Sequence, residues 1–162
     1  MKKFAIQIIF LLILAFGGLY LSINQNLFGD LFPSSQQPTQ QQIKIGRSIV
    51  KVEVADNPGE RSKGLGGRDS LASDSGMLFV FSEAGTHRFW MKGMKIPLDF
   101  IFIKNGKVVD VLKSIPNPEP NQKDADLPIY QPADPIDMML EVNSGFIDSH
   151  GIKAGDQVYQ IK

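Results

Sequence analysis

The chain has 162 residues, which is enough for one domain with a hydrophobic core of its own, and it carries 17 basic and 17 acidic residues. This balance argues against nucleic acid as a partner, because nucleic-acid-binding domains carry an excess of lysine and arginine. The chain contains no cysteine, which excludes disulfides, a cysteine nucleophile and a lipid-modified N-terminal cysteine.

An almost unbroken apolar run occupies residues 4–23 and follows Lys2 and Lys3. About twenty apolar residues can cross the hydrocarbon core of a membrane as a helix, and the two lysines predict a cytoplasmic N-terminus. We therefore expect residues 1–23 to be a transmembrane anchor that leaves the remaining chain on the extracytoplasmic side of the cell membrane. The alternative is a signal peptide cleaved after residues 15–17, in which case the protein is secreted.

Residues 24–42 are rich in glutamine, serine and proline, and this composition predicts a flexible linker. Residues 43–162 are expected to form a single globular domain. With the basic and acidic residues of the first 42 positions set aside, 15 basic and 16 acidic residues remain. The domain is therefore nearly neutral. We expect the protein to contact the membrane through its N-terminal helix, and we do not expect it to bind nucleic acid.

The first half of the domain shows two strand patterns separated by a helix. Residues 49–54 alternate between apolar and polar, which predicts a half-buried strand. Asn57 as N-cap, with Glu60 three residues later, predicts a short helix that ends in the glycines of residues 64–67. The continuous apolar run at 77–81 predicts a strand that is covered on both faces.

The next stretch reads as three strands. We expect strands at 88–92 and 98–103 around a turn at 93–97. The Asn-Gly pair at 105–106 lies between apolar runs and predicts a hairpin to a returning strand at 108–115.

The last third begins with a long loop at residues 116–135, which holds six prolines and is expected to be functional or disordered. A strand at 138–142, a short helix that Asn143 caps and that ends at His150, and a strand at 157–161 complete the chain. The predicted fold class is α+β, mainly antiparallel β, with two short helices and a compact sheet that could close into a barrel.

Several motifs of the domain occur in a recognisable order: Gly76-Met77-Leu78-Phe79-Val80-Phe81, Phe89-Trp90-Met91-Lys92, Ile96-Pro97-Leu98-Asp99, Leu140-Glu141-Val142-Asn143-Ser144-Gly145 and Gly155-Asp156-Gln157-Val158. With these motifs the chain resembles the bacterial and archaeal domain-of-unknown-function family 192. The resemblance implies a compact, mainly β domain that is often exported and has no established activity. The chain departs from the family pattern at Gly66, where methionine is usual, and at Gly93-Met94, where Asn-Thr is usual.

The stretch at 87–103 is unusual for a strand because it combines the single tryptophan of the chain with lysine and aspartate. We hypothesise that Trp90 stacks against a sugar or another small polar ligand, while neighbouring polar side chains form hydrogen bonds to that ligand. The candidate ligand-binding residues are Trp90, Lys92, Asp99, Glu141, Asn143 and Arg68. Lys92 and Asp99 share a face in one register of the turn at 93–97 and not in the other, and the sequence does not decide between them.

The leading interpretation is a non-catalytic binding or accessory module for an envelope glycan or a small polar ligand. One alternative is a hydrolase that uses Asp99 and Glu141 as a carboxylate pair, although no catalytic signature was found. A second is a Cu(I) site of His87, Met91 and Met94, because imidazole and thioethers are the soft ligands available. A third is a structural protein-interaction module. No cofactor is expected.

Overall fold

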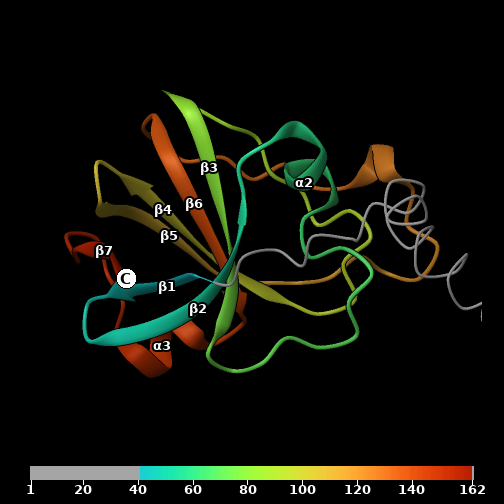
Figure 1. Cartoon of the computed structure of the whole chain (residues 1–162). Helices are drawn as coiled ribbons and strands as arrows, with labels where there is room; N and C mark the ends of the chain where they lie inside the picture. Colours follow the sequence, from blue (N-terminus) through green and yellow to red (C-terminus); the bar gives the residue numbers. More distant parts are fainter. Residues whose placement is uncertain (1–40, 162) are drawn as a thin grey trace, which may run out of the picture. The chain divides into compact units, whose positions relative to one another are not determined.

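The structure, a computed structural model, describes residues 41–161. These residues form one seven-stranded sheet with short helices and loops (Figure 1). The strands are β1 (Gln41–Ile45), β2 (Ser48–Ala55), β3 (Ser75–Gly85), β4 (Leu98–Lys104), β5 (Lys107–Ile115), β6 (Ile136–Asn143) and β7 (Val158–Ile161). The helices are α2 (Pro58–Lys63), α3 (Phe146–His150) and the short 3-10 helix η1 (Asp124–Asp126). The expected N-terminal anchor and most of the expected linker lie outside the described residues. Within 41–161 no helix has the length and apolar character that a membrane crossing requires.

The sheet has the strand order β5-β4-β6-β3-β2-β1-β7 and is mixed. Every neighbouring pair is antiparallel except β2 and β3, which are parallel. The expectation of a mainly β fold with two short α-helices is confirmed, but the sheet does not close into a barrel. Its two edge strands are linked at one end only, where a bridge joins Lys107 to Gln157 and the amide of Val108 donates to the carbonyl of Asp156.

The short helix α2 forms where the capping pattern predicts it. The Asn57 side chain accepts a hydrogen bond from the Glu60 amide at 3.0 Å, and the Glu60 carboxylate accepts one from the Asp56 amide at 3.2 Å. These two bonds satisfy N–H groups that have no partner inside a helix. The β4–β5 hairpin also follows its signal, with Asn105 and Gly106 both at positive φ, 51° and 68°.

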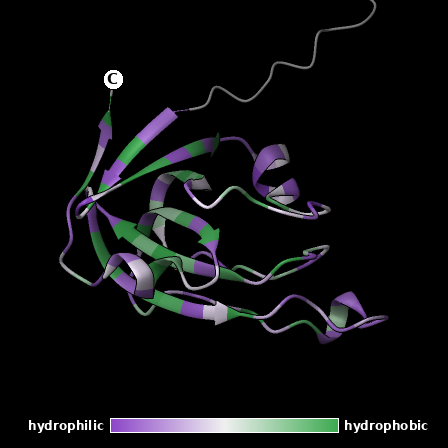
Figure 2. Cartoon of the chain, turned by 90° about the horizontal axis from the view of Figure 1, so that it is seen from below, coloured by the Kyte–Doolittle hydropathy of each residue, from purple (hydrophilic) through white to green (hydrophobic). Residues whose placement is uncertain are grey.

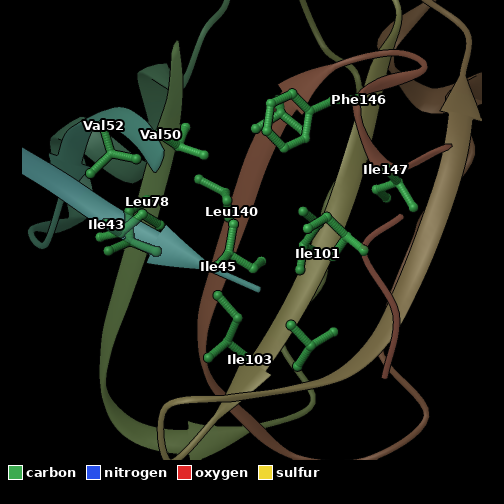
Figure 3. Close-up of a cluster of buried hydrophobic side chains, with 13 residues drawn as sticks. Ile43, Ile45, Val50, Val52, Leu78, Ile101, Ile103, Leu140, Phe146 and Ile147 are labelled. Atoms are coloured by element: carbon green, nitrogen blue, oxygen red, sulfur yellow. The ribbon is translucent and has the colours of Figure 1, made fainter. Parts of the chain in front are cut away.

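Two hydrophobic clusters lie on opposite faces of the sheet. The first core cluster combines the inward valines and isoleucines of β1 and β2 with alternate residues of β3, β4 and β6 and with Phe146 and Ile147 of α3 (Figure 3). The second core cluster holds Phe100 and Phe102 of β4 together with side chains from the loop at 86–97. Hydrophobic colouring accordingly concentrates on the strands, while α2 and the loop tips are largely hydrophilic (Figure 2).

The strand expected at 88–92 does not form, and this prediction is wrong for a topological reason. Both edges of β4 are occupied, by β5 on one side and by β6 on the other, so residues 88–92 cannot pair with β4 as a further strand. Phe89 pairs with Tyr130 through two main-chain hydrogen bonds of 2.8 Å. This bridge fastens the loop at 86–97 to the loop at 116–135 over the second core cluster.

Candidate functional site

Asp99 is fully buried and has a structural role. One carboxylate oxygen accepts a hydrogen bond from the Ser114 amide at 2.8 Å, and the other accepts one from the Ile147 amide at 2.9 Å. Ile147 is in the first turn of α3, so Asp99 satisfies an N–H group that the helix itself leaves free. The bond also fixes α3 against β4. Asp99 therefore does not join Lys92 at a surface, and it is not available to a ligand.

Glu141 is buried on the other face of the sheet. It lies opposite Met77 on β3 and Phe100 on β4, whereas Asp99 lies opposite Val142. Because successive residues of a strand point to opposite faces, the two carboxyl groups are separated by the sheet. The carboxylate pair of the hydrolase hypothesis is therefore not assembled in this structure.

The environment of Glu141 favours the neutral acid. Its Oε2 is buried without a hydrogen-bond partner among the described residues, and the side chain is 6% exposed. Removal from water raises the pKa of Glu141 from 4.5 to about 8, since a charge in an apolar core is poorly solvated. At neutral pH Glu141 is therefore mostly protonated.

Arg68 belongs to a part-buried ion pair that connects the loop after α2 to β2. Its two terminal nitrogens donate to the two carboxylate oxygens of Glu53 at 2.5 and 2.7 Å. These hydrogen bonds are the main reason why the pKa of Glu53 lies below its ordinary value. The guanidinium is thus committed to a partner within the domain.

Asn143 ends β6 and does not cap α3, contrary to the sequence-based expectation. Its side-chain amide donates to the carbonyls of Leu71 and Ala72, each at 3.0 Å, and holds that loop against the sheet. The N-cap position of α3 is taken by Gly145, whose φ is 85°. Asn143 also lines an open groove of about 400 Å³ beside α3.

Trp90 lies at the surface, with 46% of its area exposed, and so does Lys92. Lys92 Nζ lies 5.3 Å from the centroid of its ring, within the range of a cation–π contact. The same Nζ pairs with Asp124 of η1 at 2.6 Å. We refer to Trp90, Lys92 and Asp124 as the Trp90 patch. Sequence reasoning missed Asp124 because its loop has no periodicity, although a charged run within a proline-rich loop was a visible signal.

The residues of the copper hypothesis are divided between the surface and the core. The ring of His87 stacks on Phe81 at a centroid distance of 3.6 Å, and its Nε2 bonds to the Glu83 carbonyl at 3.2 Å. Met91 and Met94 are buried in the second core cluster, at 2% and 8% exposure. Both methionines thus have a packing role. Residues 41–161 contain no group of three or more His, Asp or Glu side chains suited to a metal ion.

Comparison with known proteins gives one family and two similar structures. Residues 40–160 match the DUF192 family, described as "Uncharacterized ACR". A crystal structure from Sinorhizobium meliloti 1021, of a protein proposed to be a transcription regulator, is similar with a TM-score of 0.66 and 28% identity, over 75% of this chain and 94% of that one. A protein of unknown function from Novosphingobium aromaticivorans DSM 12444 also has a TM-score of 0.66 and 28% identity, over 73% and 83%. No curated protein matches the chain.

Proposed function

The chain belongs to the DUF192 family, and we propose that its domain is a non-catalytic module that captures an envelope glycan or another small polar ligand at the Trp90 patch. The observation that carries the proposal is the exposure of Trp90. A tryptophan is usually largely buried, yet this indole keeps 46% of its surface in contact with solvent. An exposed indole face offers the apolar surface on which a sugar ring can stack.

The surroundings of Trp90 support a binding role because they hold the ring and provide polar groups at its edge. The Phe89–Tyr130 bridge fixes the residue before Trp90 to the opposite loop, and Phe89 itself packs in the second core cluster. Lys92 and Asp124 place an ammonium and a carboxylate beside the ring. Stacking together with charged hydrogen-bonding groups suits a ligand that has both a hydrophobic ring face and hydroxyl or amide substituents. A platform fixed in advance also loses little entropy when the ligand binds.

The proposed setting is the extracytoplasmic side of the cell membrane, with the domain tethered by the N-terminal apolar segment. This part of the proposal depends on the sequence of residues 1–23 alone. The role of transcription regulator that is proposed for the S. meliloti protein is not carried over to this chain. The domain has about as many acidic as basic residues, which does not suit a nucleic-acid partner. Protease treatment before and after the cell membrane is permeabilised tests this location. The domain should be digested while the cell membrane is intact, and digestion only after that membrane is permeabilised would contradict the proposal.

Isothermal titration calorimetry of the full-length protein tests the binding. The protein should be kept in a detergent with a polyethylene-glycol headgroup, because the sugar headgroup of a glycoside detergent would compete with the glycan for the site. Soluble peptidoglycan fragments and neutral glucan oligosaccharides are suitable probes. We expect saturable binding of at least one envelope glycan, a loss of about tenfold or more in affinity for Trp90→Ala and a smaller loss for Lys92→Gln.

Tyr159→Ala is the matched control. Tyr159 is another exposed aromatic, at 56%, on the edge strand β7. Its removal should leave the affinity unchanged. If Trp90→Ala binds the glycan as tightly as the wild type, or if Tyr159→Ala weakens binding equally, the proposal fails.

A further inference from the structure

A second pocket lies where three segments of the described chain meet, at the β1–β2 turn, the end of α3 and the turn before β7. Its volume is about 340 Å³, and it is lined by Gly46, Arg47, His150, Gly151, Lys153 and Asp156. It shares His150 with the open groove beside α3. None of its residues belongs to the Trp90 patch, so its role is independent of the function proposed above.

The charges of this pocket leave one arginine without a partner. Both oxygens of Asp156 are engaged by Lys153, through its amide at 2.9 Å and its Nζ at 3.3 Å. These contacts, above all the hydrogen bond from the Lys153 backbone amide, lower the pKa of Asp156. The carboxylate is therefore ionised, and the charge of Lys153 lies beside it. Arg47 has neither an ion pair nor a side-chain hydrogen bond within residues 41–161. Its guanidinium is thus free to bind an external anion.

His150 adds an oriented nitrogen to the pocket. Its ring stacks on Phe146 with centroids 4.0 Å apart, and its Nδ1 lies 2.9 Å from the Phe146 carbonyl and 3.0 Å from Ser149 Oγ. These contacts occupy Nδ1 and fix the plane of the imidazole. Because the Phe146 carbonyl can only accept, Nδ1 carries the hydrogen of that bond. In the described part of the chain Nε2 makes no hydrogen bond, and it donates to a ligand only when it also carries a hydrogen.

We propose that this pocket binds a small oxyanion, a phosphate or carboxylate group, through Arg47 and Lys153, with the ring of His150 in the wall of the pocket. Arginine presents a planar fork of N–H donors that matches two oxygens of such a group, and lysine adds a second positive charge. Arg47 and Lys153 carry two positive charges and Asp156 carries one negative charge, so the lining of the pocket has an excess of one positive charge, that of the unpaired Arg47. The remainder of a larger ligand can extend into the adjoining groove, whose lining includes the hydroxyls of Ser73 and Ser144.

Nuclear magnetic resonance of the full-length protein in a non-ionic detergent and a buffer free of phosphate tests the proposal. The probes are inorganic phosphate and glucuronate, which separate a phosphate from a carboxylate as the preferred oxyanion. We expect the His150 ring resonances to shift with saturation for at least one probe. Arg47→Gln should weaken binding by about fivefold or more, because the fork is lost. Asp156→Asn should tighten it by about twofold or more, because the one negative charge is removed while an acceptor oxygen is kept.

Arg88→Gln is the matched control, since Arg88 is also exposed and also lacks an ion pair among the described residues. It should bind the probe as the wild type does. Opposite effects of Arg47→Gln and Asp156→Asn, with no effect of Arg88→Gln, establish the site. Absence of saturable shifts with both probes, or equal losses in Arg47→Gln and Arg88→Gln, would overturn the proposal.

Discussion

Replacing Glu141 with glutamine should change how the stability of the domain depends on pH. Burial raises the pKa of Glu141 to about 8, whereas the carboxyl of the unfolded chain titrates near 4.5. Between these values the folded state holds a proton that the unfolded state has lost. The free energy of unfolding therefore falls as pH rises, and the contribution that is fully present below pH 4.5 is lost by the time the pH passes the folded pKa.

The size of the effect follows from the difference between the two pKa values. One unit corresponds to about 1.4 kcal/mol, so the shift amounts to roughly 5 kcal/mol at most, of which roughly 4 kcal/mol falls between pH 5 and pH 8. Such a change is comparable with the whole stability of a small domain. Glutamine has no titrating group, so the variant should lack this slope although it also buries an amide.

Urea unfolding at pH 5, 6, 7 and 8 measures the effect as the difference between the wild type and Glu141→Gln. The variant should gain stability relative to the wild type at each step of rising pH. Glu83→Gln, which replaces an exposed glutamate, is the control and should follow the wild type. Parallel stability curves for the wild type and Glu141→Gln over this range would refute the assignment of Glu141 as a buried neutral acid.

Three further substitutions test other parts of the structure. Asp99→Ala should lower the free energy of unfolding by about 3 kcal/mol, because two backbone N–H groups lose their acceptor, and Asp99→Asn should recover part of the loss; equal stability of both variants and the wild type in urea would contradict this. Gly76→Ala should destabilise by about 3 kcal/mol, since its Cβ would lie 2.5 Å from the Glu141 carbonyl oxygen, whereas Gly59→Ala in α2 should be neutral or stabilising in thermal melts. Trp90→Ala should lower the free energy of unfolding by about 1–2 kcal/mol, less than the roughly 3–5 kcal/mol lost with a fully buried tryptophan, because about half of the residue is exposed. A loss as large as that of a buried aromatic would contradict its place at the surface.

Features set by neighbouring residues could be predicted from the sequence. The cap of α2 depends on Asn57 and Glu60 alone, and the β4–β5 hairpin depends on the Asn-Gly pair at its tip. The end of α3 at His150, followed by Gly151 in the left-handed region, is equally local. The expected strands that formed all lie within a few residues of their predicted bounds.

Features set by distant strands could not be predicted. The faces of Asp99 and Glu141 depend on the register between β4 and β6, which joins residues about 40 apart in sequence. The absence of a strand at 88–92 depends on β5 and β6 occupying both edges of β4. The strand β1 begins at Gln41, within the expected linker, although the alternation of Ile43 and Ile45 before a Gly-Arg turn was a usable signal.

The candidate site was predicted only in part for the same reason. The composition of residues 87–103 drew attention to Trp90, which is exposed in the structure, but it could not show that Lys92 pairs with Asp124 instead of meeting Asp99. That pair joins two loops, and no short-range rule specifies which loops meet.

The indole N–H resonance of Trp90 gives the most direct test of ligand capture at the Trp90 patch. The chain contains one tryptophan, so the spectrum of the full-length protein contains a single indole cross-peak. We predict that titration with an envelope glycan that binds in calorimetry shifts this peak to saturation, with the affinity that calorimetry gives. The shift should be the same in Tyr159→Ala. A glycan that binds by calorimetry and leaves the indole peak unmoved, or the absence of binding to any envelope glycan, would contradict the account.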